Sequence, residues 1–244
     1  MANSINKKPE DGEQKTGNTI SRKNFFKYAG ASMVGAAAIG LYGCGDDEDP
    51  MGPPMEEAVY LGTGDVGILN YAYALEQLEA AFYIMATDQN SWMQEGDGEI
   101  FEAIRDHEIA HRDWFSAVIG SVNEEARIPG LTPNFSTVDF SDRNSVLGAA
   151  QLLEDTGVTA YNGAGHLIEN PDYLVQAGKI VSVEARHASS IRGLIQPGSF
   201  YGSITAASGL DAAASPADIL AAAGGFIDDE IDASGLPQPA NVYS

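Results

Sequence analysis

The chain has 244 residues, with 35 acidic and 13 basic side chains, a formal net charge of -22 and a pI of about 4.2. This length suits one large domain or two small ones, and the acidity argues against nucleic acid as a partner, because phosphate binding needs Lys and Arg. Cys44 is the only cysteine, so neither an intramolecular disulfide nor a thiolate metal cluster can form. Any metal site must therefore use oxygen and nitrogen ligands.

Residues 1–43 have the pattern of an export signal. A polar, basic stretch precedes an apolar run that ends at Leu41 and is too short for a permanent membrane helix. The segment SRKNFFK at 21–27 resembles a twin-arginine signal. Lys23 stands where the second arginine is expected, so the general export route also stays open. LYGC at 41–44 resembles a lipoprotein cleavage site.

The lipoprotein resemblance implies cleavage before Cys44 and acylation of that cysteine. The protein would then be exported and held at a membrane, facing the periplasm or the cell exterior. The alternative is a free cysteine that follows an apolar segment. Residues 44–57 are acidic, contain Pro and Gly and lack a packing pattern, which predicts a tether between the anchor and the folded domain.

Four segments between residues 58 and 200 show the apolar spacing of amphipathic helices, at about 65–86, 99–119, 142–168 and 172–194. Ser141 is expected to cap the third helix, and Gly120 to close the second. Two short connections and one long one, 121–141, predict two antiparallel hairpins joined by a crossover. We therefore predict an all-α four-helix bundle with a long crossover, followed by a short helical and irregular extension at 201–244.

Each predicted helix carries a glutamate within its apolar stripe, and the second and fourth helices carry a Glu-x-x-His pair. The six residues are Glu76, Glu108, His111, Glu154, Glu184 and His187. A spacing of three places the Glu and the His of each pair on one helix face. A carboxylate and an imidazole inside an apolar stripe are costly to bury unless something pairs with them.

The two halves of the bundle also resemble each other. Glu76 and Tyr83 have the same Glu-x6-Tyr spacing as Glu154 and Tyr161, which indicates a repeated helix pair. Both tyrosines suit plain core aromatics, and both are also placed to hydrogen-bond a ligand or to relay an electron.

The order of the six residues matches the ligand rule of di-iron and di-manganese carboxylate bundles. Carboxylates bridge two nearby divalent ions, and four of them offset four positive charges, so the buried cluster is tolerable only while metal is bound. Positions left open on the metals would admit dioxygen, peroxide or water. The alternative is a set of core polar residues that bond to one another.

Three further residues lie within the predicted helices beside this set. His107 and His166 have no carboxylate three residues before them and are expected to be surface or structural residues. Gly157, in a helix interior, costs about 1 kcal/mol relative to alanine. It either opens a small cavity at the metals or admits a close neighbouring helix, and the second interpretation is preferred.

Residues 58–200 resemble the ferritin-like superfamily, in particular its exported branch, which includes plant desiccation-related proteins. The matching segments are DVGILNYAYALEQLEAAFY, HEIAHRDWF, LLEDTGVTAYNGA and VEARHASSI. The resemblance implies that Glu76 and Glu154 are terminal ligands and that Glu108 and Glu184 bridge. It also implies that His111 and His187 each bind one metal. The expected cofactor is two iron ions, with manganese as a possibility.

Several functions are compatible with this resemblance. The leading hypothesis is Fe(II) oxidation or peroxide consumption in oxidative-stress defence, with a small oxidant as the reactant and a homodimer as a possible assembly. A close variant is manganese catalase-like peroxide dismutation. The single cysteine excludes a built-in rubredoxin-type electron donor. A rival from another class is a non-enzymatic, stress-protective or structural protein of the cell envelope, so whether the chain is an enzyme stays open.

Overall fold

The computed structural model describes residues 57–200 and 209–237. The long helices are α2 (Gly64–Asp88), α3 (Asp97–Asn123), α4 (Arg143–Ala164) and α5 (Pro171–Ile195). The shorter elements are β1 (Val59–Tyr60), η1 (Asn90–Trp92), η2 (Glu124–Ala126), η3 (Gly165–Leu167), α6 (Pro216–Ala223), η4 (Gly224–Phe226) and β2 (Ile231–Asp232). Within the described ranges, no helix combines the length and the apolar character that a membrane span requires.

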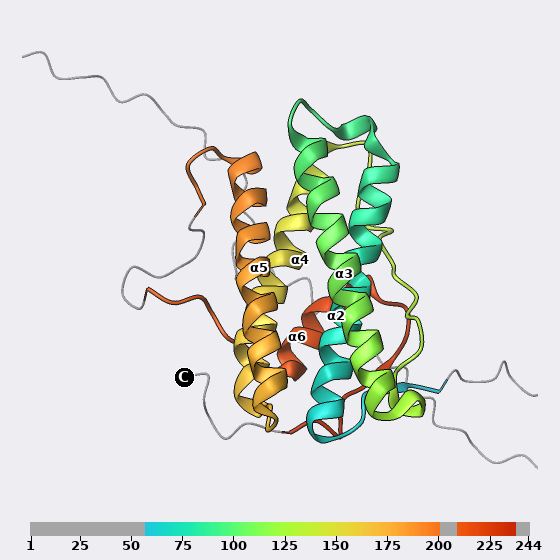
Figure 1. Ribbon diagram of the computed structural model, residues 1–244. Helices are drawn as coiled ribbons and strands as arrows, with labels where there is room; N and C mark the ends of the chain where they lie inside the picture. Colours follow the sequence, from blue (N-terminus) through green and yellow to red (C-terminus); the bar gives the residue numbers. More distant parts are fainter. Residues whose placement is uncertain (1–56, 201–208, 238–244) are drawn as a thin grey trace, which may run out of the picture. The chain divides into compact units, whose positions relative to one another are not determined.

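The four long helices form the predicted all-α bundle. α2 and α3 form one antiparallel hairpin and α4 and α5 form the other (Figure 1). The crossover from residue 124 to residue 142 runs along the length of the bundle and returns the chain to the end at which α3 began. Each hairpin therefore contributes two helices to a shared interior, as the two short connections and the long one predicted.

Local polar contacts fix where the helices begin. Asp142, not Ser141, caps α4, and its side chain accepts a hydrogen bond from the Asn144 N–H. In the same way, the Asn170 side chain accepts from the Asp172 N–H at the start of α5, where proline occupies the first helical position. An oxygen of the cap residue satisfies an N–H that has no partner within the helix.

Two helix ends differ from the sequence prediction. α3 continues through Gly120 to Asn123, and α4 ends at Ala164 and is followed by the 3₁₀ turn η3, so the helix does not reach Ile168. A glycine costs a helix only about 1 kcal/mol, so it does not by itself end a helix.

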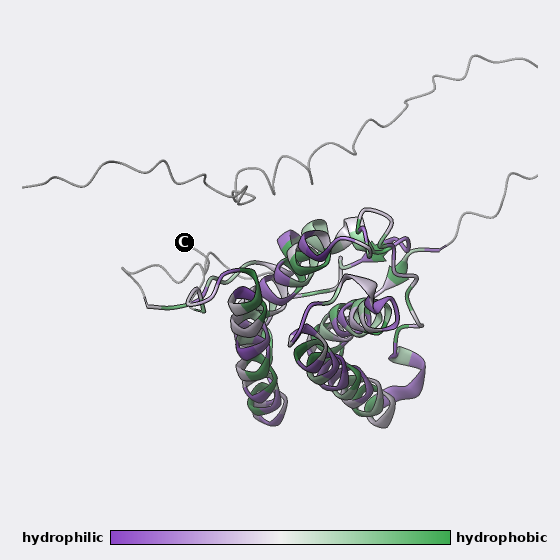
Figure 2. Cartoon of the chain, turned by 90° about the horizontal axis from the view of Figure 1, so that it is seen from above, coloured by the Kyte–Doolittle hydropathy of each residue, from purple (hydrophilic) through white to green (hydrophobic). Residues whose placement is uncertain are grey.

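The crossover is attached to α2 by the side-chain amides of a buried asparagine and a partly buried glutamine. Asn70 donates to the Ala126 carbonyl (2.7 Å) and accepts from the Ile128 N–H (3.2 Å). Further along α2, Gln77 accepts from the Leu131 N–H (2.9 Å). These bonds satisfy backbone groups that the crossover would otherwise leave without partners. α2 is buried on almost every side, whereas α5 buries mainly the face that carries Glu184. Seen from above, hydrophilic and hydrophobic residues alternate around the long helices (Figure 2).

The C-terminal segment closes the other side of α2 and α4. α6 lies against α4, where Gly163 permits close approach: a Cβ added there would meet the Ala214 carbonyl oxygen at 1.8 Å. β2 then pairs in parallel with β1, and Ile227 bridges Pro133 of the crossover. Within residues 209–237, the described part of the expected extension, the chain therefore packs on the core and braces the helices that carry the site.

Candidate metal centre

The six residues of the predicted set meet at the centre of the bundle. Their glutamates, one from each long helix, are fully buried, and His187 is nearly so. His111 is partly buried. α3 and α5 each bring a glutamate and a histidine to the interior because residues three apart lie on one helix face. We call these six residues the cage: Glu76, Glu108, His111, Glu154, Glu184 and His187.

The cage divides into two groups of four possible ligands. One group contains Glu76 and His111 and the other contains Glu154 and His187, and both contain Glu108 and Glu184. Within each group, the possible ligand atoms lie within 4.8 Å of one another. Two carboxylates that belong to both groups are suited to bridge two cations, since each carboxylate has two oxygens.

The histidine nitrogens lie among the carboxylate oxygens. His111 Nδ1 is 3.1 Å from Glu184 Oε1 and 3.3 Å from Glu108 Oε2. His187 Nδ1 is 2.7 Å from Glu108 Oε1 and 3.5 Å from Glu154 Oε2. Nitrogen and oxygen donors therefore converge from all four helices.

Several buried atoms of the cage have no hydrogen-bond partner, which is costly in an interior. They are Glu76 Oε2, Glu108 Oε1, Glu154 Oε2, both oxygens of Glu184 and His187 Nδ1. The short distance from His187 Nδ1 to Glu108 Oε1 lacks the geometry of a hydrogen bond. Divalent cations would satisfy these atoms and offset the four carboxylates. The residues present therefore fit a pair of metal ions bound by oxygen and nitrogen.

The cage carboxylates hold protons on the two histidines. Burial alone would lower the pKa of His111, but contacts with Glu108, Glu184 and Glu76 outweigh it and raise that pKa to about 12. Burial alone would likewise lower the pKa of His187, but contacts with Glu108, Glu154 and Glu184 outweigh it and raise that pKa to about 12. Each imidazole must lose a proton before its own Nδ1 can bind a metal.

The carboxyl groups of the cage differ from one another in their pKa. Burial, with the neighbouring Glu184, raises the pKa of Glu108 well above its usual range. Burial also raises the pKa of Glu154, to about 7. At Glu184 burial is outweighed by His111 and His187, which lower its pKa. The two histidinium groups therefore favour the ionised form of Glu184.

The two tyrosines bond across the hairpins. Tyr83 of α2 donates to Glu154 of α4 (2.5 Å), and Tyr161 of α4 donates to Glu76 of α2. Each phenol therefore orients the glutamate of the opposite helix, and not the one two turns away on its own helix. The crossed pairs relate the two halves of the cage in the way that the repeated spacing suggested.

His107 is a site residue that sequence reasoning assigned to the surface or to a structural role. Its ring is exposed, but its Nδ1 lies 2.9 Å from His187 Nε2 and the two rings stack. Since His187 turns Nδ1 toward the cage, His107 holds the opposite nitrogen of the same ring. Such an outer partner fixes the tautomer and orientation of a ligand histidine. His107 precedes His111 by four residues, so the two side chains lie on the same side of α3.

Glu79 is a second residue that the predicted set leaves out. It lies one turn after Glu76 on α2, is buried, and its Oε2 has no hydrogen-bond partner. Gly157 of α4 faces it, and a Cβ added to Gly157 would meet oxygens of Glu79 (3.0 Å) and Glu184 (3.4 Å). The preferred interpretation of Gly157 is therefore wrong, because the space it leaves is filled by carboxylates and not by the backbone of a neighbouring helix.

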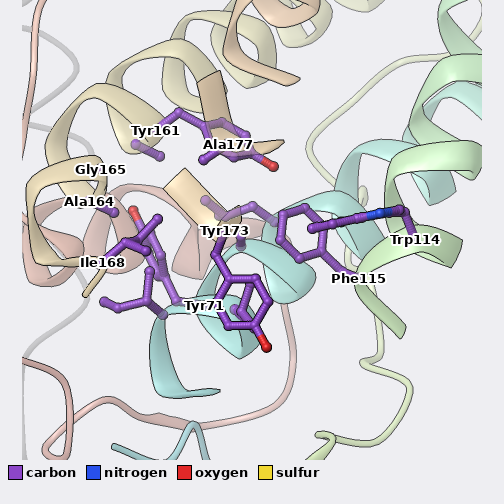
Figure 3. Close-up of a pocket in the computed structure, with 14 residues that line it drawn as sticks. Tyr71, Trp114, Phe115, Tyr161, Ala164, Gly165, Ile168, Tyr173 and Ala177 are labelled. Atoms are coloured by element: carbon purple, nitrogen blue, oxygen red, sulfur yellow. The ribbon is translucent and has the colours of Figure 1, made fainter. Parts of the chain in front are cut away.

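An apolar pocket lies beside the cage, between the four long helices (Figure 3). Its walls include Trp114, Phe115 and Tyr173, together with the ring of Tyr161. Tyr161 connects the pocket to the cage, since its hydroxyl bonds Glu76. A small uncharged molecule would find a compatible environment there.

Cys44, the predicted lipidation site, lies outside the described residues.

Comparison with known proteins agrees with this architecture. No curated protein matches the chain. The model of the ferritin-like domain family matches residues 64–197, from the first residue of α2 to just beyond the end of α5, and so includes the whole cage. On this match over more than half of its length, the chain belongs to the ferritin-like domain family.

Proposed function

We propose that the cage binds two transition-metal ions, with iron favoured, and that the loaded protein oxidises Fe(II) or consumes peroxide. The observation that carries the proposal is the division of the cage into two ligand groups that share Glu108 and Glu184. Carboxylate and imidazole ligands suit both iron and manganese. Manganese-dependent peroxide dismutation is therefore the alternative reaction within the same proposal.

The chain's own residues have separable tasks in this proposal. When bound, the metal pair would supply redox chemistry and Lewis acidity. Tyr83 and Tyr161 orient the two unshared glutamates by donating hydrogen bonds to them. His107 orients His187 from the outside. The apolar pocket beside Tyr161 supports a small uncharged reactant such as dioxygen.

We further propose that the protein is exported and lipid-anchored at Cys44. The support is the signal-like sequence of residues 1–43 and the acidic tether at 44–57. An acyl chain at Cys44 would make the membrane a partner of the protein. Mass spectrometry of the full-length product from membrane fractions tests this: an unmodified Cys44 would contradict it.

The metal proposal is tested by elemental analysis of protein produced with added iron or manganese. We expect about two ions per chain, bound through the two groups of the cage, and consumption of Fe(II) or peroxide that chelation abolishes. Glu184→Ala should lower the metal content while the protein stays helical. Retention of fewer than one ion per chain, with a melting temperature indifferent to chelator, would exclude the proposal. It would favour a non-enzymatic role for the bundle.

A further inference from the structure

Glu79 is a fifth buried glutamate at the centre of the bundle, and its side chain is only 3 % exposed. Its Oε2 has no hydrogen-bond partner. A carboxylate buried in this state is expensive unless a cation or a donor reaches it. Nothing in the ligand pattern of one glutamate per helix accounts for Glu79, since Glu76 already fills that position on α2.

Gly157 is the residue of α4 that makes room for this carboxylate. The nearest atoms to a Cβ added at position 157 are Glu79 Oε1 (3.0 Å), Glu184 Oε2 (3.4 Å) and Glu79 Oε2 (3.6 Å). Contacts near 3.0 Å are tighter than side chains normally allow, so a methyl group would push Glu79 away. Gly148 of the same helix has nothing within 4 Å of the equivalent point. The two glycines therefore differ in whether they border the cage.

The charges that act on Glu79 come from the cage. Burial, and then Glu184 and the other three cage carboxylates, raise the pKa of Glu79 well above its usual range. Glu79 and Gly157 also border a small pocket whose other lining residues are mostly apolar, including Leu78, Leu153 and Phe226. The charges that act on an ionised Glu79 are therefore mainly other carboxylates, and metal cations bound in the cage would stabilise it.

We propose that Glu79 is a seventh ligand of the metal pair, admitted to the cage by Gly157. The inference rests on the proposed metal binding. Four carboxylates offset the charge of two divalent ions, so a fifth carboxylate favours a pair in which one ion is trivalent. Glu79 therefore biases the cage toward higher total metal charge.

The test compares a divalent and a trivalent ion that both resist redox change under the assay conditions: Mn(II), kept anaerobic, and citrate-buffered Ga(III). Binding to the full chain is measured by equilibrium dialysis with metal analysis. In Glu79→Gln we expect the affinity for Ga(III) to fall by about tenfold or more, in the range seen when groups that support a metal site are removed. The affinity for Mn(II) should change by less than about threefold, because four carboxylates remain to offset two divalent ions.

Gly157→Ala should weaken Ga(III) binding in the same way, and Gly148→Ala is the matched control that should bind like the wild type. Far-UV circular dichroism checks that each variant folds, and the rise in melting temperature on adding Ga(III) gives a second measurement of binding. If the wild type binds two ions and Glu79→Gln binds both metals as the wild type does, Glu79 is not a ligand and the proposed function stands. If the wild type binds neither ion, the proposed function itself fails.

Discussion

Replacing Glu108 by glutamine should have opposite effects on the metal-free and the metal-loaded protein. Glu108 is fully buried and belongs to both ligand groups. Burial and the adjacent Glu184 raise its pKa, so folding favours the neutral carboxyl group. The resulting cost to the stability of the metal-free wild type is absent below the unfolded-state pKa of about 4.5. It grows as the pH rises above that value and is complete once the pH has passed the folded-state pKa. Glutamine supplies the neutral form at every pH.

The metal-free variant should therefore melt at or above the temperature of the wild type at pH 7.5. The loaded variant should lose stability, because a shared anionic ligand is missing. A loss of about 10- to 100-fold in affinity for each ion, the range for perturbed metal sites, corresponds to about 1.4–2.8 kcal/mol per ion. For two ions this is about 3–6 kcal/mol, or about 6–24 °C in melting temperature for a domain of this size.

The assay is thermal unfolding followed by circular dichroism, with chelator or with saturating Mn(II). Glu102→Gln is the control, since Glu102 is an exposed glutamate of the same helix. Its melting temperatures should match those of the wild type under both conditions. An equal Mn(II)-induced rise in Glu108→Gln and the wild type would refute the shared-ligand role. A metal-free Glu108→Gln protein that melts far below the wild type would refute the argument from repulsion.

Three more predictions concern the groups in and around the proposed metal site. Because the pKa of His111 and of His187 is raised to about 12, the apparent metal affinity should rise with pH by up to about one log unit per pH unit for each ion. The stability that the protonated rings give the metal-free fold is complete below about pH 6.5 and is lost as the pH rises toward 12. Titration of the released protons during metal binding checks the first effect, and proton-free binding would contradict it. Tyr161→Phe should cost about 1–3 kcal/mol in unfolding free energy, because it leaves an oxygen of Glu76 without its donor; an unchanged denaturant midpoint would argue against this bond. His107→Phe should weaken metal binding by about tenfold or more while far-UV circular dichroism stays the same, and wild-type affinity would show that His107 does not orient its partner ring.

The sequence by itself determined the bundle and the six cage residues. Helical periodicity is a local property, so a Glu-x-x-His pair in an apolar stripe predicts which face a glutamate occupies without knowledge of the other helices. The order of the four glutamates along the chain then matched the ligand rule of dinuclear carboxylate bundles, on which the proposed metal site rests. The export signal and the lipidation of Cys44 also rest on sequence alone, since these residues lie outside the described ranges.

Only the tertiary structure decided which residues support the cage. Tyr83 and Tyr161 bond glutamates on the opposite hairpin, and that pairing depends on how the hairpins face each other. His107 is exposed on α3 and gains its role from the position of His187 on α5. Glu79 reaches the interior because Gly157, on another helix, leaves space for it. Contacts between distant segments follow from packing, which the spacing of residues within one helix does not specify.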